Sequence, residues 1–465
     1  MKSKVSIDIS VKSFITAIAV IFSLMVLSYV LTFIIPSGEY ARTVNDAGNT
    51  IIDTSAGFSY VEGGLPFYKW ILSPFLVLAA NGSGTLIAII IFLLVIGGAF
   101  TCLDKSGILN YMLEGISHKY GKMRYRLMTI LTLIFMALGA LVGSFEEVVP
   151  LVPIVVALAV SLGWDELTGM AMSLLAVGCG FASGVLNPFT VGVAQSLAEL
   201  PMFSGVWLRA LSFCLIFPLL LLFIRSHAKK IEKPLEDTAA ALEFKADKKM
   251  SRSLLTFAVI IGIGIVFILC STFISALQDF TMIAVALMFL IAGITSPLLT
   301  GMKITELLKH FIKGVTAIFP AVIMILMAAS IRYTLEEAKI LDTILHGAVG
   351  VADTLPKWAV ILFIYLIVLG MNFFIGSGSA KAFMLIPLIV PLAQIFGISP
   401  QLCIVAFAFG DGFSNVIYPT NAALLISLGL ADINYASWFR WTIRFQVANL
   451  ILTSAILLFG LMIGY

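Results

Sequence analysis

Long apolar segments recur along the whole chain, and polar residues gather in the short stretches between them. A helix of about 18 or more apolar residues is long enough to cross the roughly 30 Å hydrocarbon layer of a bilayer. The pattern therefore predicts an all-α polytopic membrane protein. The apolar segments lie near residues 12–35, 84–103, 127–143, 147–163, 168–200, 207–224, 254–276, 280–299, 314–335, 357–375, 382–397, 402–430 and 438–464.

The composition supports a membrane location and excludes an ordinary soluble enzyme. The 465 residues are 60% hydrophobic and 11% charged, with a mean hydropathy of +1.09, whereas soluble domains carry roughly 25% charged residues. The net charge of +3 is too small to imply a nucleic-acid partner. The cysteines lack CxxC spacing and the histidines stand apart in the sequence, so we expect no certain metal centre. We also expect no cofactor and no enzymatic activity.

The polar stretches divide the chain and set its expected orientation. The longest of them, residues 225–253, is rich in Lys and Arg, so the positive-inside rule places it in the cytoplasm. Basic residues before the first apolar segment place the N-terminus on the same side, and the weakly acidic stretch 39–62 is then outside. We predict a multi-pass protein of the cell membrane in which 225–253 links a first repeat, 1–224, to a second, 254–465.

The two predicted repeats share three sequence blocks in the same order. Counting crossings from the linker, the chain enters the first Gly-Ser block from inside and the second from outside. The repeats are therefore expected to be inverted, a construction used by secondary transporters. The blocks are a Gly-Ser turn before prolines at 143–153 and 376–391, a Gly-x-Gly-Phe sequence leading to proline at 178–188 and 410–419, and a Trp-x-Arg sequence at 207–209 and 438–440.

Each repeat contains a predicted re-entrant helical hairpin and a predicted broken helix. The hairpins lie near 127–163 and 357–397, where paired apolar runs are short for a full span. The longer runs near 168–200 and 402–430 carry a Gly/Ser/Asn cluster that ends in proline at mid-length. Proline lacks an amide hydrogen and restricts the residue before it, so it interrupts a helix. We expect four discontinuities within the bilayer.

Four ionisable residues lie at these discontinuities. Glu146 and Glu147 are at the first hairpin turn, Lys381 is at the second, and Asp411 is at the second helix break. An ionisable group at membrane depth costs a few kcal/mol on insertion scales, so it is usually functional or paired. We expect these four residues to bind substrate. The alternative is a buried ion pair that only joins structural elements.

Short polar side chains accompany the charged residues. Half-helix N-termini attract carboxylates, and carbonyls freed by a helix break can hold sodium. For any single side chain, capping of its own helix is an equally good explanation. The expected substrate-binding set adds Ser144, Ser183, Asn187, Ser377, Ser379, Asn415, Thr420 and Asn421, of which Ser144, Asn187, Ser377 and Asn415 are candidate sodium contacts.

Charged residues at the ends of the predicted spans are expected to anchor helices or to be solvated rather than to bind substrate. Arg209 and Arg440 follow a tryptophan at the start of a span, where Trp and Arg commonly anchor helices at the membrane interface. Arg332 and its acidic neighbours are expected to be solvated. Residues 67–80 and 303–313 precede equivalent spans and predict amphipathic helices lying in the membrane surface.

The Gly-Ser hairpin turns, the Gly-x-Gly-Phe breaks ending in proline and the inverted repeats together resemble the ion transporter superfamily. Within it, residues 12–464 look most like the anaerobic C4-dicarboxylate carrier (DcuC) family, in its YfcC-like branch, whose members are often described as basic amino acid antiporters. The resemblance implies an elevator-type fold with a scaffold and a transport domain in each protomer of a homodimer. It also implies the bacterial inner membrane.

The resemblance also bears on the substrate. Relatives that carry dicarboxylates with sodium contact them through Ser-Asn-Thr motifs at the hairpin turns, whereas this chain has Ser144-Phe145-Glu146 and Ser377-Gly378-Ser379. This difference removes amide donors and adds acids, so a ligand with a carboxylate and one or more ammonium groups fits better.

We expect a secondary active transporter of amino acids or related small carboxylates, and basic amino acid exchange is the favoured case. The alternative is C4-dicarboxylate transport coupled to sodium or protons. A channel is disfavoured because it would more naturally show a polar stripe through full-length spans. An intramembrane hydrolase is disfavoured because the sequence shows no arrangement of nucleophile and base.

Overall fold

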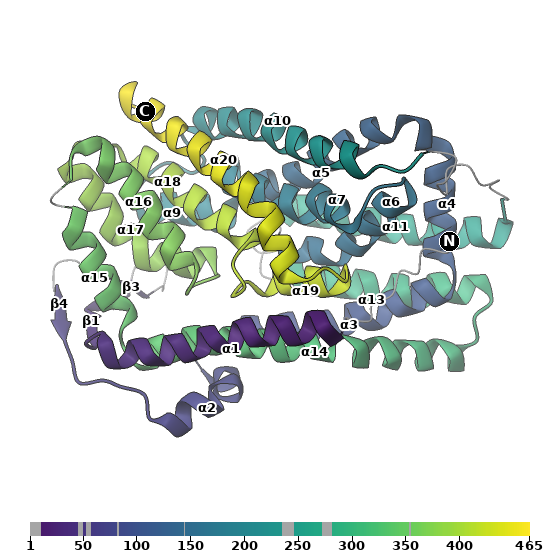
Figure 1. Cartoon of the computed structure of the whole chain (residues 1–465), viewed down its shortest axis with the longest axis horizontal. Coiled ribbons are helices and arrows are strands. Elements are labelled where there is room, and N and C mark those ends of the chain that lie inside the picture. Colours follow the sequence, from purple (N-terminus) through teal and green to yellow (C-terminus); the bar gives the residue numbers. More distant parts are fainter. Residues whose placement is uncertain are drawn as a thin grey trace.

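The computed structural model describes residues 11–44, 50–52, 57–80, 83–143, 145–234, 246–271, 281–352 and 355–465. These residues are nearly all helical (Figure 1). The helices are α1 (Val11–Ile34), α2 (Phe67–Leu76), α3 (Ser83–Lys105), α4 (Ile108–Tyr120), α5 (Arg124–Val142), α6 (Val152–Ser161), α7 (Glu166–Met170), α8 (Ala176–Ser183), α9 (Val193–Leu197), α10 (Val206–Ile231), α11 (Lys248–Ser271), α13 (Thr281–Thr300), α14 (Ile304–Glu337), α15 (Leu341–Ala352), α16 (Lys357–Asn372), α17 (Gly378–Ile395), α18 (Pro400–Gly412), α19 (Ala422–Leu430) and α20 (Tyr435–Met462).

Several of these helices have the length and apolar composition of membrane spans. Within the described ranges, nine helical stretches are long and apolar enough to cross a bilayer, which supports a multi-pass membrane protein. The stretches are Leu86–Lys105, Ile108–Val142, Glu166–Leu197, Val206–Ile231, Lys248–Phe267, Ile283–Thr300, Ile304–Glu337, Gly378–Ile395 and Tyr435–Met462.

The segment after α1 is an exception to the all-α prediction. Strand β1 (Gly38–Tyr40) pairs antiparallel with β4 (Phe58–Tyr60), and β2 (Arg42–Val44) pairs antiparallel with β3 (Thr50–Ile52). In β1, buried residues at both ends flank a partly exposed one, which is the two-residue alternation of a strand rather than the period of a helix. The segment is also more polar than the spans, so the prediction of an all-α chain is wrong here.

Long helices frame the molecule. Figure 1 shows α1 and α14 running side by side in the lower part of the view and α10 along the upper edge, while α20 runs diagonally from the upper left down toward α1. Helices α3 and α14 approach closely at Gly97 and Gly314, where a Cβ on Gly314 would lie 2.2 Å from the Gly97 carbonyl oxygen. Glycine is needed here because the two backbones touch.

Helix α14 differs from the sequence expectation at its start. Residues 303–313 were expected to form a separate surface helix, but α14 is a continuous helix of 34 residues that begins at Ile304. At 1.5 Å per residue it measures about 51 Å, well beyond the hydrocarbon thickness. The other expected surface helix exists as α2, which buries Trp70 and Ser73 and exposes the large apolar residues Phe67 and Phe75.

Two helix pairs occupy the positions of the predicted hairpins. The first consists of α5, a turn, the 3₁₀ helix η3 (Glu146–Leu151) and α6, and the second consists of α16, a turn and α17. Gly143 ends α5 with φ of 75°, a left-handed conformation that favours glycine. Ser144, a predicted site residue, lies outside the described residues.

Two helices are interrupted at mid-length. The first runs through α7, the π-helix η4 (Ala171–Leu175) and α8, then stops at Gly184, which has φ of 54°. It resumes at Pro188 in the π-helix η5 (Pro188–Gly192) and α9. The second runs through α18 and the 3₁₀ helix η8 (Phe413–Val416) and resumes as α19. Each interruption contains a proline, whose missing amide hydrogen prevents a continuous helical ladder.

The two interrupted helices cross at the centre of the molecule. Helix α5 packs on α8, α16 packs on α18, and α8 packs on α18. A Cβ on Gly412 would lie 2.3 Å from the Ala182 Cα, and one on Gly178 would lie 2.4 Å from a Val416 methyl group. Helix α8 is buried along its whole length, and α18 is buried from Leu402 to Gly412, so both breaks follow buried helices.

A hydrogen-bonded anchor holds the start of the first interrupted helix. Asp165 caps α7 by accepting from the Thr168 amide at 2.9 Å. His227 of α10 also bonds Asp165 at 2.8 Å and accepts from the Trp441 indole of α20 at 3.0 Å. Burial opposes the charged form of Asp165, but the bonds from His227 and Thr168 outweigh it and lower the pKa of the carboxyl below its usual value.

The predicted linker 225–253 is only partly described. Helix α10 extends through its first residues to Ile231, and α11 begins at Lys248. Residues 235–245 lie outside the described ranges.

Candidate substrate site at the helix breaks

A buried ion pair lies where the second hairpin meets the second interrupted helix. The Lys381 ammonium on α17 contacts Asp411 Oδ1 on α18, and both side chains are completely buried. The same ammonium donates to Asn372 Oδ1 at the end of α16. Burying two charges is favourable only when they are well paired and hydrogen-bonded, and here three helices supply the partners.

Asn372 organises this cluster, although the sequence reasoning did not single it out. Its amide nitrogen donates to the Asp411 carbonyl at 2.9 Å, to Ser414 Oγ at 2.5 Å and to Asn415 Oδ1 at 2.9 Å. Asn421 also donates to Asn415 Oδ1, at 3.2 Å. The feature of the sequence that could have identified Asn372 is its position, because it is an amide side chain at the end of an otherwise apolar run, shortly before the Gly-Ser turn.

The acids of the first hairpin turn approach the same region. Glu146 and Glu147 lie in η3 and interact electrostatically with each other, and Glu146 also interacts with the Asp411 carboxylate. Glu147 Oε2 is buried and has no hydrogen-bond partner. The site therefore combines one lysine with carboxylates from two separate elements.

Several short polar residues cap the broken helices. Asn187 Oδ1 accepts from the Phe189 and Thr190 amides at 3.0 and 3.3 Å, and Asn421 Oδ1 accepts from Leu424 at 3.1 Å. Ser377 Oγ accepts from the Ala380 amide at 3.4 Å. These contacts match the capping alternative.

Other polar groups at the breaks either have no hydrogen-bond partner or bond to atoms of their own segment. The Asn187 amide nitrogen and Thr190 Oγ1 are buried without a hydrogen-bond partner. Ser183 bonds the carbonyl of Gly180 in its own helix at 2.6 Å. The hydroxyl oxygens of Ser379 and Ser377 are 3.4 Å apart. The Thr420 side chain is partly exposed.

Gly378 brings the two interrupted helices into the same site. A Cβ at this position would lie 2.4 Å from Thr190 Cγ2 and 2.7 Å from Asp411 Oδ2. The second hairpin thus fits between the restart of the first interrupted helix and the acid of the second. Asp411 Oδ2, which faces the glycine, is buried without a hydrogen-bond partner, whereas on the Thr190 side it is the methyl group that lies against Gly378.

The two Trp-x-Arg blocks use different side chains for hydrogen bonding, Arg209 in the first half and Trp438 in the second. Arg209 is fully buried and donates to the carbonyls of Val185 and Phe203 at 3.4 and 3.3 Å. The interpretation of Arg209 as an interface anchor is therefore wrong, because its helix start packs against the first break. Arg440 is exposed, and in its half the Trp438 indole donates to the Val416 carbonyl at 2.8 Å.

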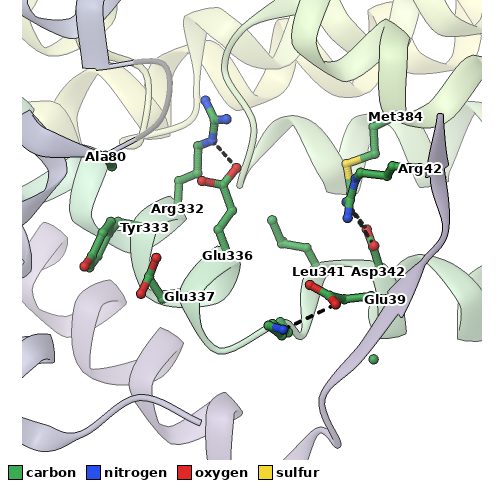
Figure 2. Close-up of a pocket in the computed structure, with 12 residues that line it drawn as sticks. Glu39, Arg42, Ala80, Arg332, Tyr333, Glu336, Glu337, Leu341, Asp342 and Met384 are labelled. Atoms are coloured by element: carbon green, nitrogen blue, oxygen red, sulfur yellow. Dashed lines mark hydrogen bonds and ion pairs between the residues drawn. The ribbon is translucent and has the colours of Figure 1, made fainter. Parts of the chain in front are cut away.

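A separate polar cavity of about 460 Å³ lies between the strand segment and the end of α14 (Figure 2). Ion pairs line the walls of this cavity. Burial raises the pKa of the Asp342 carboxyl, and the hydrogen bond from the Tyr40 amide and the charge of Arg42 partly offset this rise. The Arg332 and Glu336 side chains are 38% and 40% exposed, in agreement with the solvated interpretation. The pairs are Arg42 with Asp342 at 3.0 Å, Lys339 with Glu39 at 3.3 Å and Arg332 with Glu336 at 2.7 Å.

The fold and its buried polar site define a multi-pass helical membrane protein with charged groups at the breaks of its helices. Among the described residues, no group of three or more His, Cys, Asp or Glu side chains is placed to hold a metal ion. The chain belongs to the C4-dicarboxylate anaerobic carrier family, DcuC, which it matches over residues 14–462. It is therefore a member of a membrane transporter family.

Two curated relatives align with the chain. A protein of Escherichia coli K12 named "Putative basic amino acid antiporter YfcC" is 30% identical over 406 residues, covering 82% of this chain and 79% of the relative. An uncharacterised protein of Haemophilus influenzae is 22% identical over 501 aligned positions, covering 96% of each chain. The resemblance to the DcuC family and its YfcC-like branch is confirmed.

Two solved transporter structures also align with the chain. The YdaH transporter of Alcanivorax borkumensis has a TM-score of 0.46 at 18% identity, covering 97% of this chain and 99% of that protein. MtrF of Neisseria gonorrhoeae, described with a class of antimetabolite efflux pumps, has a TM-score of 0.46 at 15% identity, covering 95% and 94%. The family assignment rests on the family match and the Escherichia coli relative.

Proposed function

We propose that this protein is a secondary active transporter of amino acids or related small carboxylates, and that it exchanges basic amino acids. The observation that carries the proposal is the fully buried Lys381–Asp411 pair beside Glu146. A site with one lysine and several carboxylates suits a ligand that has one carboxylate and more than one ammonium group. The name of the Escherichia coli relative, a basic amino acid antiporter, supports the same class of substrate.

In this proposal, substrate binding exchanges one set of charge pairs for another. The ligand carboxylate bonds Lys381, and a ligand ammonium group bonds Asp411, so neither protein charge is left alone in the interior. A second ammonium group interacts with Glu146 or Glu147. Short polar groups at the breaks, including Asn415, complete the ligand's hydrogen bonds.

C4-dicarboxylate transport coupled to sodium or protons is the second candidate function. It is favoured by the description of the family that the chain belongs to. In this case Lys381 attracts one carboxylate, Glu147 and Asp411 act as coupling acids, and Asn187, Ser377 and Asn415 are the described candidates for sodium contacts. The two functions make opposite predictions for ligands that carry additional ammonium groups.

We further propose that the repeats 1–224 and 254–465 are inverted and move in an elevator-like manner. The similar packing of α5 on α8 and of α16 on α18 supports a repeated construction. Family resemblance supports a homodimer with a scaffold and a transport domain in each protomer. It also supports the bacterial inner membrane, and the loop charges support a cytoplasmic N-terminus.

A ligand panel measured against charge variants distinguishes the two candidate functions. Purified parent protein, Lys381→Ala and Glu147→Gln are screened by thermal shift against arginine, lysine, ornithine, neutral amino acids, fumarate and succinate, because a ligand that binds the folded state raises its Tm. For basic amino acids, Lys381→Ala weakens binding but keeps the preference for diamino over neutral ligands. Glu147→Gln selectively weakens the diamino ligands.

Dicarboxylate transport predicts the opposite pattern. Loss of the Lys381 charge-assisted hydrogen bond, worth about 1.5 to 3 kcal/mol, reduces dicarboxylate affinity about tenfold to a hundredfold. Glu147→Gln then spares or improves dicarboxylate binding. Glu62→Gln, at an exposed acid outside the site, is the matched control. Equal loss for every ligand in both site variants contradicts both functions and favours a purely structural ion pair.

A further inference from the structure

The Lys381 ammonium occupies a small pocket of oxygen atoms that comes from two other helices. Asp411 Oδ1 of α18 and Asn372 Oδ1 of α16 both contact it. An ammonium group has three hydrogens and no acceptor, so a charged carboxylate and a neutral amide oxygen suit it. The same pair of oxygen types also suits a small monovalent cation.

We propose that Asp411 and Asn372 form a monovalent-cation position that Lys381 fills from within the chain. The tethered ammonium replaces a dissociable sodium ion at this position, and a primary ammonium group of the substrate displaces it from Asp411. The displacement step rests on the proposed amino acid transport. The identity of the position as a cation site does not rest on it.

The orientation of Asn372 supports this assignment. Its amide nitrogen is directed to the Asp411 carbonyl, Ser414 Oγ and Asn415 Oδ1, all of which can accept. These contacts fix the amide so that Oδ1 faces Lys381. Carbonyl, carboxylate and hydroxyl oxygens are the ligands that hard cations prefer, and the oxygen of Asn372 is held ready for a positive charge.

The second carboxylate oxygen of Asp411 offers a place for an incoming ammonium group. Asp411 Oδ2 is buried without a hydrogen-bond partner and lies next to Gly378. Asp411 can therefore begin to bond a second cation through Oδ2 while Oδ1 still contacts Lys381. Gly378 has no side chain, so its backbone can lie close to Asp411 Oδ2, where a Cβ would come within 2.7 Å of that oxygen.

The burial of the Lys381–Asp411 pair explains why it matters that the cation is part of the chain. Both side chains are completely buried, and an unpaired carboxylate in that environment is strongly unfavourable. A lysine on the neighbouring helix α17 is always available, whereas a sodium ion must be taken from solution. Neutralisation of Asp411 in the absence of substrate is thus independent of the sodium concentration.

Chemical rescue by a small ammonium ion tests the cation position directly. The Tm of detergent-purified Lys381→Ala is measured in ethylammonium, sodium, choline or tetramethylammonium chloride at equal ionic strength. We expect ethylammonium to raise the Tm by about 3 °C or more at saturation, because it supplies N–H donors of the missing side chain. Tetramethylammonium has no N–H donor and should give no rescue.

The double variant Lys381→Ala/Asp411→Asn is the matched control, because it lacks both the tethered cation and the charge that binds it. It should not respond to ethylammonium. If Lys381→Ala responds to none of these cations, or if the double variant responds equally, the proposal is overturned. Amino acid binding by the parent protein is measured separately, so failure of the transport proposal leaves this result interpretable.

The parent protein supplies a second test that does not depend on recovering folded Lys381→Ala. Replacing choline with sodium should leave the parent Tm unchanged, because Lys381 already occupies the position. If sodium raises the parent Tm and this rise is lost in Asp411→Asn, a dissociable cation binds at Asp411. That result overturns the proposal that Lys381 fills the position.

Discussion

At the scale of single residues, the carbonyl groups released by the two helix breaks need hydrogen-bond donors. A buried carbonyl without a partner is unfavourable. In the second half, the Trp438 indole donates to the Val416 carbonyl at 2.8 Å. In the first half, the Arg209 guanidinium donates to the Val185 carbonyl at 3.4 Å. Related Trp-x-Arg blocks thus use different side chains to satisfy corresponding breaks.

This difference predicts unequal effects of the same substitution in the two halves. Trp438→Phe removes the indole donor and leaves the buried Val416 carbonyl unsatisfied, which should lower the free energy of unfolding by about 1 to 3 kcal/mol. Trp207→Phe is the matched control, because Trp207 occupies the corresponding position and is 48% exposed. The measurement is the SDS-induced unfolding midpoint of each variant in mixed micelles. Equal destabilisation contradicts the assigned role of Trp438.

Sequence reasoning could identify some residues of the candidate site but not how they pair. Lys381 and Asp411 stand out because charge within an apolar run is expensive, yet their contact depends on how two helices pack. Asn372 was missed because an amide at the end of an apolar run resembles a helix cap. Arg209 was misinterpreted because the sequence does not reveal whether a helix start faces lipid or protein.

At the scale of helices, the crossing of α8 and α18 depends on small residues. A Cβ added at Gly412 would lie 2.3 to 2.4 Å from the Ala182 backbone and Cβ. Backbone atoms cannot rotate away as a flexible side chain can. The crossing therefore sets the distance between the two breaks and, through them, the position of Asp411 next to Gly378.

Gly412→Ala should force these two helices apart. We expect a loss of about 1 to 3 kcal/mol in unfolding free energy from overpacking, together with weaker binding of whichever ligand the panel identifies. Gly262→Ala on α11 is the control, since nothing lies within 4 Å of its added Cβ, and it should change stability little. Wild-type unfolding and binding in Gly412→Ala contradict the close crossing.

The elements themselves were more predictable than their boundaries. Apolar runs indicate helices because a bilayer leaves few other ways to satisfy backbone hydrogen bonds, and prolines indicate interruptions because they remove a donor. The continuity of α14 from Ile304 was missed, since charged residues at its start resemble a surface segment. The short strands were missed because their pairing joins residues on both sides of a polar loop.

At the scale of the whole molecule, charge is segregated along the chain. Basic residues gather near the end of α10 and the start of α11, including Lys229, Lys230, Lys248 and Lys249, whereas the strand segment and the stretch to Glu62 are weakly acidic. Positively charged loops remain preferentially on the cytoplasmic side of a membrane. The family match establishes a membrane transporter, and the charge distribution predicts its orientation.

Cysteine labelling tests this orientation at two exposed positions. In a variant whose native cysteines are replaced by serine, Glu62→Cys should react with an impermeant thiol reagent added to intact cells, because Glu62 is expected outside. Lys248→Cys should react only after the cells are permeabilised, because the basic start of α11 is expected in the cytoplasm. Both side chains are exposed in the structure, so permeabilised cells should label both and serve as the control. Labelling of Lys248→Cys in intact cells, with Glu62→Cys protected, means that the chain has the opposite orientation and that the loop charges do not determine it.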